Sequence, residues 1–433
     1  MHDNSAVRDS SAVRVEKSDQ SNPVGDMPTE LLRETMHRVA DISADFLAQV
    51  GKMRVSPNIR PGDIRAALPP TPPQSGEPPE ALLRDFEQII VPNTTHWNHP
   101  AFMAYFASTG SAPGIVGEAL AATINNNAML WRTGPAQTEL EEHVCDWLRQ
   151  MMGLPAEFRG HINDTASIGS LISLAAAREC QTDLQIRQKG MCGRSDLPRL
   201  TVYASEQAHS SIDKAVLTLG IGLENLRRIP TDAQFRMIPA ALEHAVSADR
   251  AAGARPIAVV ATVGTTSTTS VDPPRAIGEI ARRHKMWFHI DAAHAGSAAI
   301  CPEYRAQMDG LELGDSLVVN PHKWLFTPKD CSVLLVRDPH ALRAAFSLVP
   351  EYLRTSETDA TNLMDYGVQL GRRFRSLKLW FVIRTFGVAG LQERIRFHCD
   401  LARQFENWVR GDSRFELCAP VPFSTVCFRA VPP

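Results

Sequence analysis

The sequence predicts an α/β protein in which a mostly parallel β-sheet is covered by helices on both faces. From about Gly110 onward, apolar runs alternate with helical stretches along the chain. The runs are continuous in Val, Ile and Leu, which is typical of strands buried on both faces. They occupy residues 200–204, 257–263, 287–290, 317–319 and 333–336. Functional side chains of such sheets gather beyond the strand ends, so we expect Thr265, Asp291 and Asn320 to converge, since each follows a run.

The first part of the chain is predicted to be a disordered tail followed by a helical arm. Residues 1–26 are rich in Ser, Asp and Asn and carry too little apolar surface to offset the entropy of ordering. Within the arm, 27–109, a helical spacing of apolar side chains begins after Pro28 and recurs over 82–90. The proline-dense segment 61–79 between these two stretches predicts an extended connection rather than a packed element.

The rest of the chain is predicted to form a large α/β domain, 110–385, and a small C-terminal domain, 386–433. The large domain ends in a predicted helix over 372–384, and a second helix is predicted over 391–410. Two strand-like segments close the sequence, at 415–418 and 425–429. Two strands alone form a marginal sheet, so we expect this small α+β domain to be incomplete.

Composition argues against several kinds of partner. The net charge of the 433 residues is −3 at pH 7, which gives no long-range attraction to nucleic acid or to an acidic membrane surface. No stretch approaches the length of a membrane span, and the start of the chain lacks the apolar core of a signal peptide. The eight cysteines are scattered without a CxxC pair, which is typical of thiols in a reducing compartment. We therefore expect a cytoplasmic protein that binds neither nucleic acid nor membrane.

Lys323 is the strongest chemical signal in the sequence. It follows the apolar run 317–319, and an ammonium group at the end of a buried strand is costly unless it serves a reaction. Asp291 closes another apolar run. A lysine that can hold an aldehyde and an aspartate that can hold a pyridinium are the two protein groups that pyridoxal phosphate needs. Singly, a lysine is usually a surface charge and an aspartate after a strand usually forms a turn, so the prediction depends on the pair.

Other polar segments that follow predicted strands could complete a cofactor site. Residues 164–170 lead into an apolar helix, a pattern that suits phosphate binding at a helix N-terminus and equally suits an ordinary N-cap. His209 could lay its ring on an aromatic cofactor, although a helix-entry histidine explains it as well. The segment 264–266 forms a strand exit whose hydroxyl groups could meet the cofactor or simply turn the chain.

Motifs of other enzyme classes are missing from the sequence. It contains no HExxH, no GxSxG, no Walker loop and no GxGxxG after a strand, so it lacks the parts of a metalloprotease, a serine hydrolase or a nucleotide-binding enzyme. His143 and His161 have no partners at metal-ligand spacing. We therefore expect no metal site.

Eight ordered blocks carry a family resemblance that runs from about Met27 to the C-terminus. They are 95–97, 99–106, 138–141, 164–167, 207–211, 289–293, 320–324 and 371–378. In these blocks the chain resembles the group II pyridoxal-phosphate amino-acid decarboxylases, most closely the aromatic-L-amino-acid decarboxylase branch. The resemblance implies the type I (aspartate aminotransferase-like) fold of pyridoxal-phosphate enzymes, with a mostly parallel seven-stranded sheet. It also implies a homodimer that uses the N-terminal arm and has its active sites at the subunit interface.

The resemblance assigns roles to individual residues. It implies that Lys323 forms the Schiff base with pyridoxal phosphate and that Asp291 pairs with the pyridine nitrogen. His209 would stack on one face of the ring and Ala293 would pack on the other, with Thr266 nearby. The residues implied around the phosphate are Ala166, Ser167, Asn320 and His322. Those implied for the substrate wall are Trp97, Tyr105 and Phe106, with Met129 also facing the substrate.

The implied reaction is decarboxylation of an L-amino acid to the amine and carbon dioxide. Tyr352 falls in the loop where the family places its proton donor. The family's sister activity forms aldehydes by oxidative deamination, and it often has Phe at the position of Tyr352 or Asn at that of His209. Both residues here match the decarboxylases. We expect an aromatic substrate such as tryptophan, DOPA, phenylalanine or tyrosine.

Three departures from the family pattern leave alternatives open. Met129 stands where the aromatic branch often has Phe, Ala107 replaces a common Pro, and 125–127 is a run of three Asn. A non-aromatic substrate is therefore an alternative, as is an aldehyde synthase. Family members also continue beyond Pro433, so a cofactor-binding dimer with little activity is a further alternative.

Overall fold

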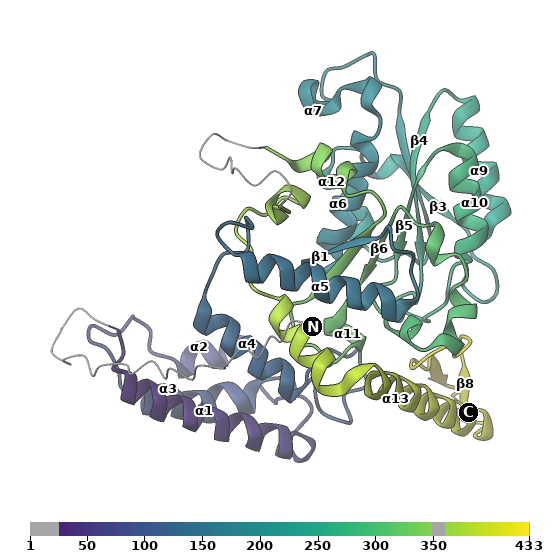
Figure 1. Ribbon diagram of the computed structural model, residues 1–433. Coiled ribbons are helices and arrows are strands. Elements are labelled where there is room, and N and C mark those ends of the chain that lie inside the picture. The colour runs from purple at the N-terminus through teal and green to yellow at the C-terminus, as the bar shows by residue number, and fades with distance from the viewer. Residues whose placement is uncertain (1–25, 349–359, 433) are drawn as a thin grey trace, which may run out of the picture. The chain divides into compact units, whose positions relative to one another are not determined.

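The computed structural model describes residues 26–348 and 360–432. Within these residues the chain forms two compact units, and the division falls between Met103 and Ala104 (Figure 1). Residues 1–25, which the sequence predicts to be disordered, lie outside the described residues.

The first unit is helical, as the spacing of its apolar residues predicts. Its helices are α1 (Thr29–Gln49), α2 (Asp63–Ala67) and α3 (Pro79–Asp85), and a π turn follows at Phe86–Ile90. The prediction of a wholly extended connection over 61–79 is wrong, because α2 lies within it. Gly62 adopts a left-handed φ of 105°, and the Asp63 carboxylate accepts a hydrogen bond from the backbone N–H of Arg60 at 2.6 Å, so the chain turns into a short helix.

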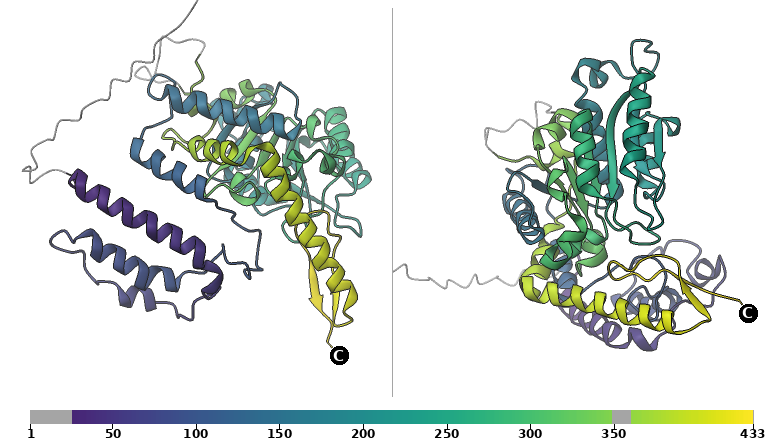
Figure 2. Two further views of the ribbon diagram at one scale, coloured as in Figure 1. Left: turned by 60° about the horizontal axis from the view of Figure 1, so that its bottom comes forward. Right: turned by 90° about the vertical axis from the view of Figure 1, so that its right-hand side faces the viewer.

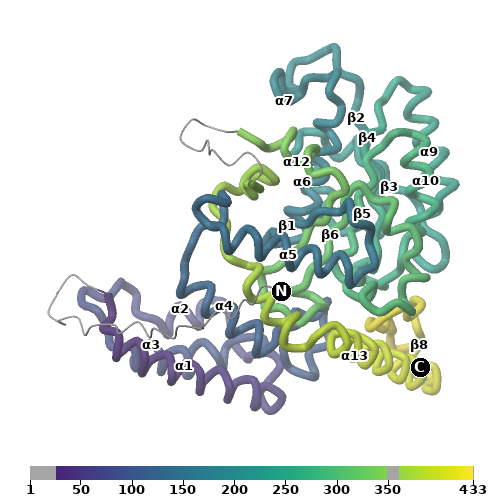
Figure 3. The backbone as a smooth tube through the Cα atoms, viewed as in Figure 1, coloured from purple at the N-terminus to yellow at the C-terminus, as the bar shows by residue number. Residues whose placement is uncertain are grey.

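A seven-stranded sheet forms the centre of the second unit in the described residues, with the order β1-β7-β6-β5-β4-β2-β3. Its strands are β1 (Arg159–Asn163), β2 (Leu200–Ser205), β3 (Leu226–Ile229), β4 (Arg255–Thr262), β5 (Trp287–Asp291), β6 (Ser316–Val319) and β7 (Ser332–Val336). Neighbours from β3 to β6 pair in parallel, whereas β7 is antiparallel to β6 and β1. Figure 3 traces this arrangement. The mostly parallel sheet and the type I fold are confirmed.

Helices cover both faces of the sheet (Figure 2, right). The α-helices described in this unit up to residue 348 are α4 (Ala112–Ile124), α5 (Pro135–Met152), α6 (Ala166–Glu179), α7 (Ile186–Lys189), α8 (Ser211–Thr218), α9 (Pro239–Ala251), α10 (Pro274–His284), α11 (Pro321–Trp324) and α12 (Pro339–Phe346). Side chains of β4 alternate between the faces: Val259 belongs to the buried cluster that includes residues of α9 and α10, whereas Val260 belongs to the cluster that includes residues of α6 and α8. Because both faces are apolar, the strand runs are continuous in sequence.

The C-terminal part begins with the long helix α13 (Ser376–Gly411), which runs through residue 385. Gly387 interrupts it with φ 63° and ψ 172°, so two helical stretches meet at an angle, as the left view of Figure 2 shows. The antiparallel strands β8 (Phe415–Leu417) and β9 (Phe428–Ala430) follow. In the parts of the chain that the structure describes, no helix is both long enough and apolar enough to cross a membrane.

Candidate active site

A cavity lies beyond the ends of β2, β4, β5 and β6, where the carboxyl ends of parallel strands share one edge of the sheet. It is lined by Phe106, Thr165, Ala166, Ser167, His209, Ser211, Thr262, Gly264, Thr266, Asp291, Ala293, His294, Asn320, His322 and Lys323. These residues come from segments that are far apart in sequence. The cavity thus brings together the lysine and the aspartate that the sequence singles out.

Lys323 reaches the cavity from α11, the short helix that follows β6. Its backbone carbonyl accepts a hydrogen bond from the Thr109 hydroxyl at 2.7 Å, which holds the helix turn in place. Burial lowers the pKa of the Lys323 ammonium, and the charge of Lys329 adds to this effect, whereas the Asp291 carboxylate opposes it. The neutral amine, which is the nucleophilic form, is therefore more accessible here than in water.

Asp291 ends β5 and is buried, with 5% of its surface exposed. Its Oδ1 accepts a hydrogen bond from the backbone N–H of Ala293 at 3.1 Å. Two residues earlier, the ring of His289 lies 3.1 Å from Ser170 Oγ and 2.9 Å from Ser316 Oγ. Burial lowers the pKa of His289 to about 4, although Asp291 opposes this shift. The ring is neutral at pH 7, so it does not compete with a cationic ligand for the carboxylate.

The N-terminus of α6 opens onto the cavity through Ala166 and Ser167. Thr165 has the extended backbone of an N-cap residue, but its side chain does not cap the helix. The N–H groups of the first turn therefore face the cavity with the positive end of the helix dipole behind them. Gly169 lets α6 approach the sheet, because a Cβ there would lie 3.0 Å from Val318 Cγ2. These features suit a phosphate group.

His322 and Asn320 add polar groups to the cavity. His322 Nδ1 accepts the backbone N–H of Cys331 at 2.9 Å, so the neutral ring carries its proton on Nε2. Burial lowers the pKa of His322 to about 4, and the nearby charge of Lys323 contributes to this shift. The Oδ1 atom of Asn320 is buried and accepts no hydrogen bond from the described residues. A bound ligand could satisfy both side chains.

His209 and Thr266 line the cavity as the resemblance implies. His209 Nδ1 accepts the backbone N–H of Ser211 at 3.1 Å and lies 3.0 Å from its hydroxyl, which fixes the orientation of the ring. Thr266 follows Gly264, whose φ of 89° turns the chain sharply at the end of β4. A side chain at Gly264 would also lie 2.7 Å from Ala295 Cβ, so glycine is required there.

A stack of three aromatic rings forms one wall of the cavity. The rings of Phe106 and His294 are 3.8 Å apart and nearly parallel, and Trp324 lies 5.1 Å behind His294. The Lys323 Nζ atom lies 5.4 Å from the centre of the Phe106 ring. Burial lowers the pKa of His294 to about 3, and Lys323 contributes to this shift, so the ring is neutral.

Sequence reasoning missed two of these cavity residues, His294 and Thr262. His294 directly follows Ala293, and the matched block stops one residue short of it. Its position after a strand was a usable signal. Thr262 lies inside an apolar run, and nothing in its surroundings in the sequence sets it apart.

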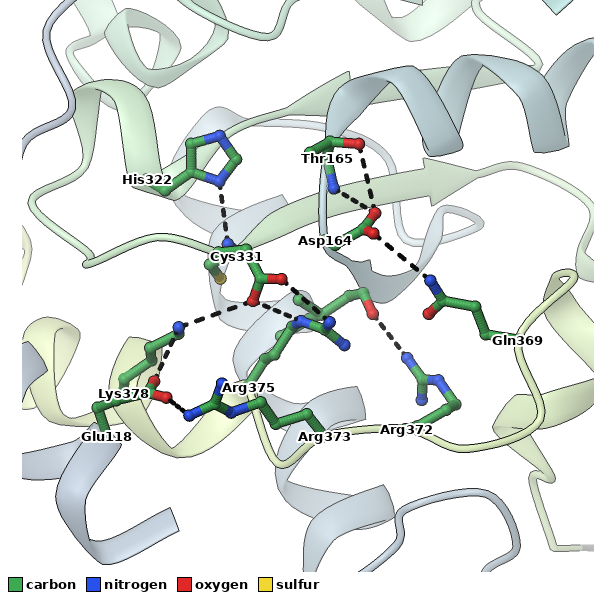
Figure 4. A network of polar contacts seen from close by, with 12 residues as sticks. Glu118, Asp164, Thr165, His322, Cys331, Gln369, Arg372, Arg373, Arg375 and Lys378 are labelled. Carbon is green, nitrogen blue, oxygen red and sulfur yellow. Dashed lines mark hydrogen bonds and ion pairs between the residues drawn. The ribbon is translucent and has the colours of Figure 1, made fainter. Parts of the chain in front are cut away.

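A network of buried and partly buried charges lies close to His322 and Cys331 (Figure 4). Lys378 Nζ is 2.8 Å from the carboxylate of Glu118 and 4.0 Å from that of Asp330, which also pairs with Arg375 at 2.8 Å. Arg372 donates to Glu141 and to the carbonyl of Ile162 at 2.6 and 2.7 Å. Asp330 precedes Cys331, whose backbone N–H holds His322. The network therefore anchors the segment that orients His322.

The structure does not bring every expected site residue to this cavity. Tyr105 is 85% exposed, and Met129 packs with Leu130 and Met364, so neither lines the cavity. Trp97 belongs to the first unit, where its ring lies 4.8 Å from that of Phe102. Tyr352 lies outside the described residues.

A larger cavity, of about 750 Å³, lies between α5, β1 and the segment around Tyr366. It is lined by charged, aromatic and apolar side chains, including Glu142, Asp146, Arg159 and His161, but by no lysine. It cannot supply the amine chemistry for which the sequence argues. Among the residues described, no cluster of three or more His, Cys, Asp or Glu side chains could hold a metal ion.

Comparisons with known proteins agree with this geometry. Residues 61–431 match the family described as the pyridoxal-dependent decarboxylase conserved domain. Tryptophan decarboxylase 1 of Oryza sativa is 43% identical over 92% of this chain and 80% of its own length. The aromatic-L-amino-acid decarboxylase of Bos taurus is 44% identical over 90% of this chain and 82% of its own length. The crystal structure of Oryza sativa TDC with PLP and tryptamine superposes with a TM-score of 0.90 at 42% identity, over 94% of this chain and 85% of that chain.

Proposed function

We propose that this chain, which belongs to the pyridoxal-dependent decarboxylase family, converts an aromatic L-amino acid to the corresponding amine and carbon dioxide. The observation that carries the proposal is the meeting of Lys323 and Asp291 in one cavity beside a free helix N-terminus. The aromatic substrate is supported by the tryptophan and aromatic-L-amino-acid decarboxylases among the relatives.

The cavity residues fit pyridoxal phosphate, the cofactor of this family. The buried Oδ1 of Asn320 has no hydrogen-bond partner among the described residues, and no side chain caps the first turn of α6. Both can form hydrogen bonds with a bound ligand. We propose that Ala166, Ser167, Asn320 and His322 hold the phosphate, and His322 would donate its Nε2 proton. A phosphate dianion there would gain from charge-assisted hydrogen bonds and from the helix dipole.

Two charged residues, Lys323 and Asp291, are proposed to hold the ring end of the cofactor. When bound, pyridoxal phosphate supplies a conjugated ring that takes up the electrons released by the departing carboxylate. We propose that Lys323 holds the aldehyde carbon through its amine and that Asp291 holds the ring nitrogen in its protonated form. Burial favours both roles, because it lowers the pKa of Lys323 and excludes water that would screen the Asp291 charge.

His209, Ala293 and Thr266 are proposed to position the ring. His209 is oriented by Ser211 and can stack on one face, and Ala293 presents a small side chain to the other face. A flat slot of this kind keeps the scissile bond perpendicular to the ring plane, and this alignment decides which bond breaks. The role is therefore one of orientation rather than of proton transfer.

Phe106 is proposed as a residue of the substrate wall, whereas Trp97, Tyr105 and Met129 do not line this cavity and stay predictions from the family resemblance. Phe106 has the most direct support, because its ring lines the cavity on the stack with His294. An aromatic substrate side chain would gain from stacking on such a ring.

The chain is further proposed to act as a homodimer in the cytoplasm. Apolar side chains of the first unit are exposed, among them Leu32 at 48%, Leu82 at 56% and Phe86 at 42%, and a second copy would bury them. A site at the subunit interface would also cover the exposed ring of Tyr105. The cytoplasmic location is supported by the free state of all eight cysteines.

Tyr352 is proposed to return the proton to the substrate Cα after carbon dioxide leaves. Replacing Tyr352 by Phe removes the proton but keeps the ring, so amine formation should fall. Aldehyde and ammonia should rise, with dissolved O2 as the oxidant and hydrogen peroxide as its reduced product. Product analysis by mass spectrometry with L-tryptophan and L-tyrosine measures this ratio. The visible absorbance of the bound cofactor should be unchanged. This result would show that the variant lacks the proton donor but still has an intact cofactor site. An unchanged amine yield would refute the role of Tyr352.

A further inference from the structure

We propose that Cys418 and Cys427 are an oxidisable pair that forms a disulfide across the β8 and β9 hairpin. Strand pairing joins Phe415 to Ala430 and Leu417 to Phe428, so the next pair in register is Cys418 with Cys427. The backbone N–H of Cys418 donates to the carbonyl of Cys427 at 2.8 Å, which continues the ladder to this pair. The inference is independent of the proposed decarboxylation.

The geometry of the pair suits a disulfide. Directly opposed residues in an antiparallel pair have Cα atoms about 4.5–5.5 Å apart, and disulfides usually span about 4.4–6.8 Å between Cα atoms. Burial raises the pKa of the Cys427 thiol, and the neighbouring Cys418 thiol adds to this effect, as expected for two thiols on opposed residues. Bond formation therefore requires little movement of the backbone.

Access separates this pair from the other cysteines. Cys418 and Cys427 are both partly exposed, whereas Cys145, Cys301, Cys331 and Cys399 are buried. Cys180 and Cys192 are exposed, but they belong to different segments that no strand pairing joins. A small oxidant in solution can thus reach the hairpin pair, and a buried thiol is protected from it.

The bond would close a loop that supports the active-site helix. Residues between the two cysteines include Phe423, which is 1% exposed and packs edge-on against Trp324 with ring centres 6.3 Å apart. Trp324 directly follows Lys323 in α11. Oxidation would therefore restrict the motion of the 418–427 loop, whose Phe423 packs against Trp324 next to Lys323.

The chemistry is a balanced thiol–disulfide exchange with a low-molecular-weight disulfide such as glutathione disulfide. The thiolate of Cys418 attacks one sulfur of the oxidant and releases one thiolate, and the resulting mixed disulfide is attacked by the thiolate of Cys427, which releases the second. Two protein thiols are oxidised, and one small disulfide is reduced to two thiols. In a reducing compartment the pair is a dithiol, and it closes when the glutathione pool is oxidised.

The test treats the purified full chain with glutathione disulfide, alkylates the remaining thiols and digests with trypsin. Cleavage at Arg414 and Arg429 leaves both cysteines in one peptide. We expect that peptide to be two hydrogens lighter than its dithiol form and to carry no alkyl group. A further chymotryptic cut after Phe423 should leave two fragments that separate only upon reduction. A peptide with two alkyl groups, or with two glutathione adducts, would overturn the proposal.

Matched variants and a second measurement complete the test. In Cys418→Ser no internal link should form, and Cys427 should be alkylated or carry glutathione, whereas Cys180→Ser should retain the link. Hydrogen exchange over residues 418–427 should slow by roughly tenfold in the oxidised chain, because closing a loop suppresses local opening. A link that also forms in Cys418→Ser, or exchange that does not change on oxidation, would contradict the proposal.

Discussion

Asp291 carries the charge on which the proposed chemistry depends most. It is buried at the end of β5, and its Oδ1 accepts the Ala293 N–H. Replacing a preorganised partner of developing charge commonly costs about 10²–10³ in kcat. Asp291→Asn keeps the shape and removes the charge, so we expect a loss of at least this size in kcat with L-tryptophan.

Steady-state kinetics with saturating pyridoxal phosphate measure the effect of Asp291→Asn, and the visible absorbance of the lysine-bound cofactor shows whether the site is loaded. Asp213→Asn, in a surface ion pair with Arg228, is the matched control and should retain activity. Activity of Asp291→Asn within threefold of the unmodified chain would contradict the assigned role.

For individual residues, the sequence predicts the charged and polar groups of the site better than the aromatic side chains that line it. Lys323 and Asp291 can be identified in the sequence because a charge next to an apolar run is unusual. The structure places both residues in one cavity. Asn320 also lies there, as a residue beyond a strand end should. The expectation for Thr265 is wrong: its hydroxyl bonds with Thr268 and Ser270, and its neighbour Thr266 lines the cavity instead. The stacking of the Phe106, His294 and Trp324 rings could not be predicted from the sequence, because it depends on packing between distant segments.

At the scale of elements, α4 and α13 pack closely because Gly117 has no side chain. A Cβ at Gly117 would lie 2.7 Å from Lys378 Cα and 3.2 Å from the Leu377 carbonyl, which are backbone atoms that cannot rotate away. We expect Gly117→Ala to lower the free energy of unfolding by about 1–3 kcal/mol, even though alanine favours helices.

Urea unfolding followed by circular dichroism measures this difference. Gly411→Ala, at the end of α13, is the control: a Cβ added there would meet no atom within 4 Å, so stability should be unchanged or slightly higher. Equal destabilisation by Gly117→Ala and Gly411→Ala would contradict the packing argument.

The sequence predicts the strands that are buried on both faces of the sheet, but it does not predict the two strands at the sheet edges. The runs that become β2, β4, β5, β6 and β7 are mostly apolar, so they stand out in the sequence. β1 and β3 are edge strands that carry Arg159, Arg227 and Arg228, and no continuous apolar run marks them. The predicted helix over 372–384 begins only at Ser376, and Arg372 and Arg375, which precede it, form ion pairs.

At the scale of the whole molecule, buried histidines predict a loss of stability in mild acid. Burial lowers the pKa of His161 and His294 to about 3 and that of His289 and His322 to about 4. In the unfolded chain these rings titrate near about 6.5, so the unfolded state binds more protons below that pH. Their stabilising contribution is complete above pH 6.5 and is lost as the pH falls toward 4.

Raised carboxyl pKa values oppose this trend. Burial raises the pKa of Asp272 to about 6 and also raises that of Asp315, so the folded state takes up these protons at a higher pH than the unfolded state does. The four histidines outnumber these two carboxyls, so the unfolded state binds more protons than the folded state near pH 5. We expect the free energy of unfolding to fall there by at least about 1.4 kcal/mol per pH unit, the value of one net proton. Urea titrations at pH 7, 6 and 5 measure it, and constant or rising stability would contradict the sign.

If Lys323 makes this chain a decarboxylase of aromatic L-amino acids, its products with L-tryptophan must depend on that lysine. The purified protein is incubated with pyridoxal phosphate and L-tryptophan, and carbon dioxide and amine are quantified beside Lys323→Ala. We predict equal amounts of tryptamine and carbon dioxide from the unmodified chain, with visible absorbance of the bound cofactor, and neither product nor absorbance from Lys323→Ala. Aldehyde with ammonia in place of the amine, or turnover that survives in Lys323→Ala, would contradict the account.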